Sequence, residues 1–141
     1  MGRSYWFECS KCGYRAVVAG RADCGLNACV QTIVCQDCRA LYDAVVRLRI
    51  PDLPAADPAR DASRRPARLL TDARPGNAVP TFQSVIGRLL YTGARRFTWS
   101  HFALQCPVAS VHRVQAWNEP GKCPRCGLLL ERNALPYRIW D

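Results

Sequence analysis

The stretch Pro-Gly-Lys-Cys-Pro-Arg-Cys-Gly, residues 120–127, contains the element that decides the fold of this chain: two cysteines separated by two residues. The same Cys-x-x-Cys spacing occurs at Cys9/Cys12 and at Cys35/Cys38. Two thiolates with this spacing on a tight turn can both bind one metal ion. The chain is therefore predicted to fold around bound metal.

Length and composition favour metal over disulfide bonds. The chain has 141 residues and nine cysteines, and residues 51–80 are too polar and too rich in proline to join a core. The two remaining segments are so small that they need a cross-link, such as bound metal or a disulfide bond, in addition to a hydrophobic core. No apolar export segment precedes the first cysteine pair, and no apolar run is long enough to cross a membrane. We therefore expect a cytoplasmic protein in a reducing compartment, without a membrane partner.

The chain is basic, with a formal net charge of +9, and eighteen of its twenty basic residues are arginine. The planar fork of arginine suits phosphate and carboxylate recognition, but a GC-rich genome also encodes a composition rich in Arg, Ala and Pro without selection for binding. A four-thiolate zinc site contributes −2 and a site of three thiolates and one histidine contributes −1, so the metal-bound protein carries roughly +6.

Residues 1–50 are predicted to form an N-terminal zinc ribbon. Alternating apolar residues predict strands at 4–8, 14–18, 30–34 and 42–50, and Gly13 permits the chain to fold back after the first turn. The four thiolates of this module are expected to close one tetrahedral site without an open position, which contributes folding energy and no catalysis. Its predicted ligands are Cys9, Cys12, Cys35 and Cys38.

Cys24 and Cys29 lie between these two turns, without the spacing of a metal-binding turn. Replacement of a ligand, a disulfide bond and a second ion all remain open for this pair. The preferred interpretation is that both bind no metal and act as small buried apolar residues.

Residues 51–80 are predicted to be a flexible linker, since six prolines and five arginines are interleaved there with four aspartates. One short amphipathic helix is predicted over 81–92, where apolar residues recur at helical spacing from Phe82 to Leu90. Thr81 is its expected N-cap, and Gly93 follows as a C-terminal cap would. The helix is expected to pack on the chain's own sheets.

Residues 81–141 are predicted to combine this helix with a C-terminal zinc ribbon. A strand over 95–105 leads into Cys106, and three sulfurs and one imidazole then complete a second site. His101 is a rival ligand, but it lies within the expected strand, so His112 is preferred. The predicted ligands of this second zinc ion are Cys106, His112, Cys123 and Cys126, and the side chains expected to wall the small core are Trp99, Trp117, Tyr137 and Trp140.

Cys106-Pro107, the histidine that follows and residues 120–127 resemble the heavy-metal-binding domain that accompanies copper-transporting P-type ATPases and metal-efflux adaptor proteins. Leu128 stands where that family commonly has methionine, which argues against monovalent copper and favours zinc. The same residues also resemble a rubredoxin-type ribbon of the kind appended to many bacterial proteins. The resemblance implies a metal-binding fold but does not decide between the functions of these families.

The sequence favours a small, metal-stabilised, β-rich protein that binds two zinc ions and is not an enzyme, because it contains no nucleophile elbow, phosphate loop or metalloprotease motif. The predicted function is an adaptor for a macromolecular partner, most simply a protein. One alternative is a transcription- or ribosome-associated nucleic-acid-binding ribbon, and another is a heavy-metal sensor or buffer. Tetrathiolate iron in place of zinc would indicate an electron carrier.

Overall fold

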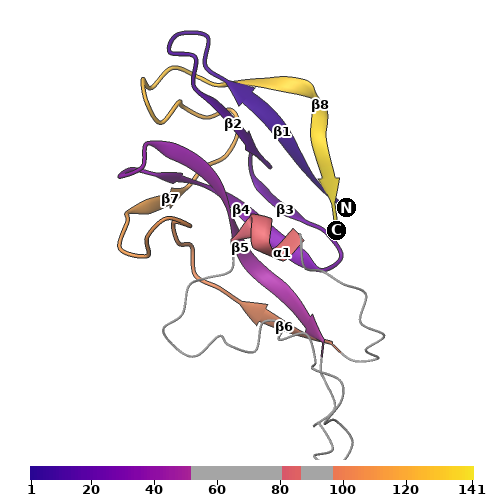
Figure 1. Cartoon of the computed structure of the whole chain (residues 1–141). Helices are drawn as coiled ribbons and strands as arrows, with labels where there is room; N and C mark the ends of the chain where they lie inside the picture. The colour runs from indigo at the N-terminus through magenta and orange to yellow at the C-terminus, as the bar shows by residue number, and fades with distance from the viewer. Residues whose placement is uncertain (52–80, 87–96) are drawn as a thin grey trace, which may run out of the picture.

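The computed structural model describes residues 1–51, 81–86 and 97–141. These residues form eight strands and one short helix (Figure 1). The elements, in chain order, are β1 Gly2–Glu8, β2 Arg15–Val18, β3 Ala22–Cys24, β4 Ala28–Cys35, β5 Ala40–Pro51, α1 Phe82–Ile86, β6 Phe97–His101, β7 Val114–Ala116 and β8 Glu131–Trp140.

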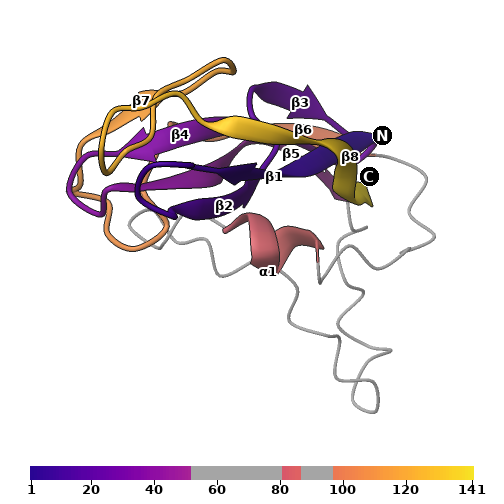
Figure 2. The same cartoon turned by 90° about the horizontal axis from the view of Figure 1, so that it is seen from above.

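The strands form two sheets. The smaller sheet has the order β2-β1-β8, and the larger has the order β3-β4-β5-β6, with β7 paired to β4. All pairings between these strands are antiparallel. Seen from above, the strands lie together on one side and α1 lies on the other (Figure 2).

The smaller sheet joins the two ends of the chain. β8 pairs with β1 along most of its length, from Gly2 opposite Trp140 to Glu8 opposite Glu131. In the larger sheet, β6 and β7 likewise pair with β5 and β4. The predicted division into one ribbon at 1–50 and a second module at 81–141 therefore does not describe this arrangement, because each sheet takes strands from both segments.

The strands predicted at 4–8, 14–18, 30–34, 42–50 and 95–105 correspond to β1, β2, β4, β5 and β6. The sequence did not predict β3, β7 or β8. β8 is an edge strand whose residues from Glu131 to Tyr137 are all exposed, so no alternation of apolar and polar residues marks it. Among the described residues, no helix is long and apolar enough to cross a membrane.

Helix α1 covers part of the core. The Ser84 backbone N–H donates to the Thr81 hydroxyl at 3.2 Å, which confirms the predicted N-cap. Phe82 meets Trp140 edge to face, with ring centroids 5.1 Å apart. The described helix ends at Ile86, so residues 87–92 of the helix predicted over 81–92 lie outside the described residues. Residues 52–80 of the linker predicted at 51–80 also lie outside them.

The buried apolar side chains form two clusters. One contains α1 residues together with the inner face of the larger sheet and Trp140, and the other surrounds Phe7 and Trp117, whose rings meet edge to face at 5.3 Å. Trp117 and Trp140 are thus core residues, as expected. Tyr137 is 53% exposed, and Trp99 lies half-buried on the outer face of the larger sheet, so neither forms part of these clusters.

Asp43 connects the two sheets. Its carboxylate is buried and accepts hydrogen bonds from the Ala19 backbone N–H, just after β2, at 3.0 Å and from the Thr32 hydroxyl of β4 at 2.7 Å. Burial raises the pKa of the Asp43 carboxyl to about 6, and these hydrogen bonds only partly oppose the shift. The folded protein therefore binds a proton at Asp43 more tightly than the unfolded chain does.

This pKa shift predicts a pH-dependent stability. The contribution of the proton at Asp43 is present at acid pH and is lost as the pH rises from 3.8 through about 6. We expect the free energy of unfolding of the wild type, relative to that of Asp43→Asn, to fall by about 1 kcal/mol between about pH 5 and about pH 7. Urea denaturation with excess zinc measures the free energy of unfolding of both proteins at each pH. Parallel pH profiles for the two proteins would contradict the raised pKa of Asp43.

Candidate metal centres

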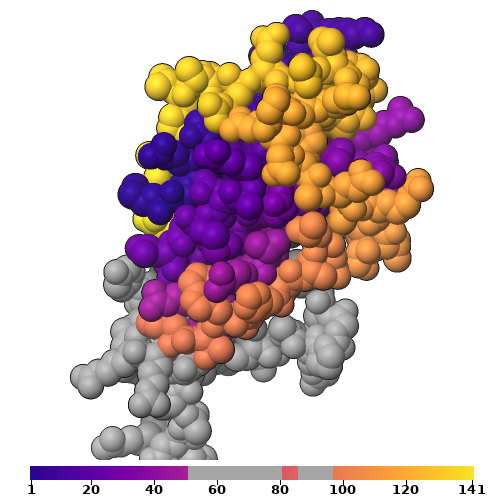
Figure 3. Space-filling model, turned by 180° about the vertical axis from the view of Figure 1, so that it is seen from behind, coloured from indigo at the N-terminus to yellow at the C-terminus, as the bar shows by residue number. Residues whose placement is uncertain are grey.

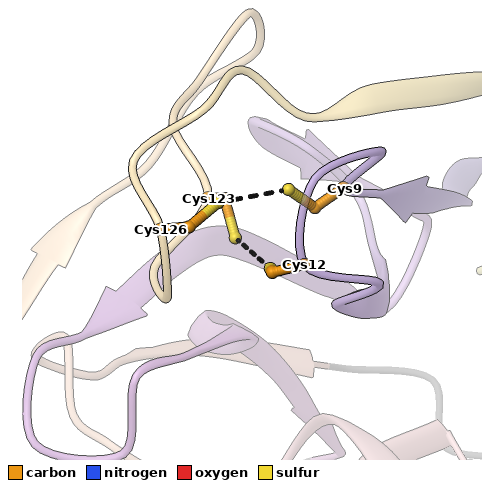
Figure 4. A group of neighbouring side chains, drawn as sticks. All are labelled: Cys9, Cys12, Cys123 and Cys126. Atoms are coloured by element: carbon orange, nitrogen blue, oxygen red, sulfur yellow. Dashed lines mark hydrogen bonds between the residues drawn. The ribbon is translucent and has the colours of Figure 1, made fainter.

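The first candidate centre joins the two ends of the chain. It contains Cys9 and Cys12, in the turn after β1, and Cys123 and Cys126, in the turn that precedes β8. The two turns face each other, and their sulfurs point into the space between them (Figure 4). The pairing of β1 with β8 brings the turns together, since both lie at the same end of the smaller sheet.

The distances in this centre fit a tetrahedral metal site. The sulfurs of Cys9 and Cys126 lie 3.4 Å apart, and those of Cys12 and Cys123 lie 3.7 Å apart. Four sulfurs at the zinc–sulfur bond length would be separated by about 3.8 Å along each edge of a tetrahedron. We call this four-sulfur group site 1.

The second candidate centre lies at the end of the larger sheet. Cys35 is the last residue of β4 and Cys38 lies in the turn that leads to β5, whereas Cys106 and His112 lie in the loop between β6 and β7. The Cys38 sulfur is 3.7 Å from that of Cys106 and 3.3 Å from Nδ1 of His112. These spacings also suit one ion with three sulfur ligands and one nitrogen ligand. We call this group site 2.

All eight side chains predicted as metal ligands lie in these two groups. The structure, however, distributes them between the groups differently from the prediction. The predicted ribbon site of Cys9 and Cys12 with Cys35 and Cys38 is not formed, nor is the predicted site of Cys106 and His112 with residues 123–126. The physical reason is strand order: β1 pairs with β8 and β2, and β4 does not belong to that sheet. Each site instead joins one N-terminal pair to one C-terminal pair.

The three Cys-x-x-Cys turns share one backbone geometry. The residue after the second cysteine has a positive φ in each turn: 67° at Gly13, 51° at Arg39 and 77° at Gly127. The first cysteine of the turn also receives hydrogen bonds, since its sulfur faces the backbone N–H of Cys38 in one turn and of Arg125 in another, at 3.3 and 3.4 Å. Such N–H donors hold the sulfur in place and partly offset thiolate charge.

In site 1 the four thiols cannot all ionise at neutral pH without a cation. The Cys12 backbone N–H, opposed by burial, is the main cause that lowers the pKa of Cys9 to about 7. The Tyr14 backbone N–H favours the Cys12 thiolate, but burial and the sulfurs of Cys9, Cys123 and Cys126 outweigh it and raise the pKa of Cys12 to about 12. Cys9 therefore ionises readily, whereas the nearby sulfurs oppose ionisation of Cys12. A divalent cation removes this repulsion.

Site 2 shows the same division. Burial opposes ionisation of Cys106, but the backbone N–H groups of Ala109 and Val108 outweigh it and lower the pKa of Cys106 to about 7. Burial, followed by the sulfurs of Cys35 and Cys106, raises the pKa of Cys38 to about 11. Both groups are thus arranged so that complete ionisation of the thiols requires a bound cation.

Site 1 is part of the hydrophobic core. Cys9 and Cys123 are buried in the same cluster as Phe7 and Trp117. The Trp117 indole N–H donates to the Lys122 carbonyl at 3.0 Å, which ties the turn of Cys123 to the core. Gly121 is required there, because a Cβ at this position would lie 2.3 Å from the Trp117 ring. Core packing therefore supports the same turn that carries two of the candidate metal ligands.

Cys24 and Cys29 form a disulfide bond across the β3–β4 hairpin, where they are directly opposite each other. The preferred expectation of two free thiols is wrong, and the disulfide that the sequence left open is present. His101 lies in β6 opposite Arg47, away from both groups, whereas His112 lies in site 2.

Comparison of the chain with protein-family models, with curated proteins and with solved structures found no match. The resemblance to heavy-metal-binding domains rested on Cys106 and His112 sharing an ion with Cys123 and Cys126. The structure places these two pairs in different groups. The chemistry of the two centres is therefore inferred from the geometry of their side chains.

The backbone of the three turns generates a prediction about stability. Arg39 holds a left-handed conformation that favours glycine, so Arg39→Gly is expected to raise the free energy of unfolding of the metal-bound protein by about 0.5 to 1 kcal/mol. Gly127→Ala is expected to lower it by about 1 kcal/mol, since a Cβ there meets no atom within 4 Å and only the backbone conformation opposes it.

Guanidinium denaturation with excess zinc measures these changes. Lys11→Gly, in another turn but without a positive φ, is the matched control and is expected to destabilise. Destabilisation by Arg39→Gly to the same extent as by Lys11→Gly would refute the backbone account.

Proposed function

We propose that this chain is a non-catalytic protein that binds two zinc ions for structural purposes and acts as an adaptor for a macromolecular partner. One observation carries the proposal: each of two clusters offers four sulfur or nitrogen donors, with all ligand atoms within 4.8 Å of one another. Each cluster takes its donors from two distant parts of the chain. Bound metal would therefore cross-link the fold.

The donor sets support zinc. Four cysteines, or three cysteines and one histidine, in a tetrahedral arrangement are typical of structural zinc sites. Each set is complete with protein ligands, so a four-coordinate ion would have no open position for water or substrate. Iron is the main competitor for the four-sulfur group and differs from zinc in its visible spectrum and redox activity.

The burial of the ligands supports a structural role over a metal sensor. Cys9, Cys35, Cys106 and Cys123 are all buried, and two of them belong to a core cluster. A sensor or buffer must exchange its metal while its fold persists. Ligands that are also core residues couple metal loss to unfolding.

The exposed surface supports the adaptor role. Trp6 and Tyr137 meet edge to face at 5.3 Å on the outer side of the smaller sheet, and Leu135 and Ile139 of β8 are also exposed. Exposed apolar and aromatic side chains on a rigid sheet are suited to macromolecular contacts. The metal ions would contribute the rigidity of this surface and no chemistry of their own.

Metal analysis and chelation test this proposal. Protein purified without added metal is expected to contain two zinc ions per chain, and removal by a strong chelator is expected to abolish the near-ultraviolet circular dichroism of its buried tryptophans. Zinc should restore the signal. Iron in the purified protein, or a metal-free protein that keeps its full signal, would refute the structural zinc role.

A further inference from the structure

The outer face of the larger sheet carries a ladder of basic and aromatic side chains on β5 and β6. Arg47 is opposite His101, and Arg49 is opposite Trp99. Because alternate residues of a strand point to the same side, these side chains share one face with Phe97. We call this set, Arg47, Arg49, Phe97, Trp99 and His101, the β5–β6 face.

The β5–β6 face lies on the side opposite α1. Leu48, between the two arginines, points the other way and packs in the core cluster with Phe82 and Val85 of the helix. Figure 3 shows the molecule from behind, where β6 in orange and β5 in magenta meet at the surface. Arg47 and His101 are exposed on this face, while the other face of the same strands forms the core.

The arginines of this face lie over its aromatic rings. The guanidinium carbon of Arg47 is 4.9 Å from the centroid of the Trp99 ring, and that of Arg49 is 4.0 Å from the centroid of the Phe97 ring. The contacts hold the planar guanidinium groups beside half-buried rings. The face therefore presents alternating positive charge and flat π surface.

No acidic side chain of the described residues neutralises this charge. Among residues 1–51, 81–86 and 97–141, neither Arg47 nor Arg49 forms an ion pair. The acidic side chains with assigned partners are engaged elsewhere: Glu8 with Arg15, Glu119 with Arg132, Asp141 with the N-terminus, and Asp23, Asp37 and Asp43 with the backbone N–H groups of Arg3, Arg113 and Ala19. The uncompensated charge favours an anionic ligand.

Covalent and predicted metal links fix the ladder at both ends. Cys29 is opposite Arg47 on the next strand and is bound to Cys24, so one row of paired residues runs from the disulfide through Arg47 to His101. Beyond His101 the chain reaches Cys106, a ligand of site 2, which also contains the Cys35–Cys38 turn that connects β4 to β5. Preorganisation of this kind lowers the entropic cost of binding.

We propose that the β5–β6 face binds single-stranded nucleic acid, with Arg47 and Arg49 on phosphates and the rings of Trp99 and Phe97 against unpaired bases. The inference rests on the adaptor role and names its partner class. Phosphates would neutralise the charge of the two arginines. Every base also has a flat face that stacks on an aromatic ring or a guanidinium plane. An acidic protein would satisfy the arginines but would not use the rings. Paired bases in a duplex are not available for stacking.

Fluorescence anisotropy with labelled oligonucleotides tests the proposal on the full chain with both zinc ions bound. The probes are uridine and thymidine oligomers of about 12 nucleotides and a duplex of equal length. The single strands are expected to bind more tightly than the duplex. Trp99→Ala should weaken single-strand binding about 5- to 100-fold with little change in its salt dependence.

The arginine variants change a different quantity. Arg47→Ala/Arg49→Ala should reduce the slope of log affinity against log salt concentration by about 1.4, the value for two phosphate contacts on a single strand. The matched control is Arg3→Ala/Arg15→Ala, which removes the same charge from the smaller sheet and should leave the slope nearly unchanged. Zinc content and circular dichroism of each variant verify that the fold persists.

Several outcomes would overturn the inference while leaving the structural zinc role intact. They are a failure of the two-zinc protein to bind either single strand, equal affinity for the duplex, and equal effects of the control pair and the β5–β6 pair. Binding only to an acidic protein would also overturn it. By contrast, a protein that lacks zinc yet folds would refute the proposed structural role, independently of any result with nucleic acid.

Discussion

The fold is arranged around thiols held within a few ångströms of one another, whose thiolates repel each other unless a cation lies between them. In site 1 the sulfurs lie 3.4 and 3.7 Å apart, and the pKa of Cys12 is raised to about 12 while that of Cys9 is lowered to about 7. Such a cluster cannot hold four negative charges without a cation, and with one it becomes a cross-link. Cys9 and Cys126 are 117 positions apart in the chain, so a metal cross-link between them would restrain a very large loop of the unfolded chain.

The two centres have complementary roles in the architecture. With metal bound, site 1 would link the turn after β1 to the turn before β8, and site 2 would link the β4–β5 turn to the loop between β6 and β7. Asp43 then joins the sheets through buried hydrogen bonds from Ala19 and Thr32. The apolar side chains are divided between two small clusters, so bound metal at the two centres would add to the contacts between the sheets.

The sequence predicts the ligands of this protein better than it predicts their partners. The spacing of each Cys-x-x-Cys pair is local, and so is the positive φ after it, which is why Gly13 and Gly127 are recognisable in advance. Which pair shares an ion with which is set by strand order, and β8, the strand that decides it, is an exposed edge without alternation. In retrospect one signal was present: the two pairs followed by glycine share site 1, whereas the pair followed by Arg39 shares site 2 with a histidine. The Cys24–Cys29 disulfide was equally hidden, since the two residues become neighbours only through the β3–β4 hairpin.

Zinc counting in paired serine variants tests the partnership of the ligands most directly. In this structure Cys9 and Cys123 belong to one centre and Cys35 to the other. Cys9→Ser/Cys123→Ser damages one centre and should retain one zinc ion per chain, whereas Cys9→Ser/Cys35→Ser damages both and should retain none. Native mass spectrometry reads both counts on the same preparation. The reverse result, one zinc ion with Cys9 and Cys35 replaced and none with Cys9 and Cys123 replaced, would show two consecutive ribbons and contradict the account.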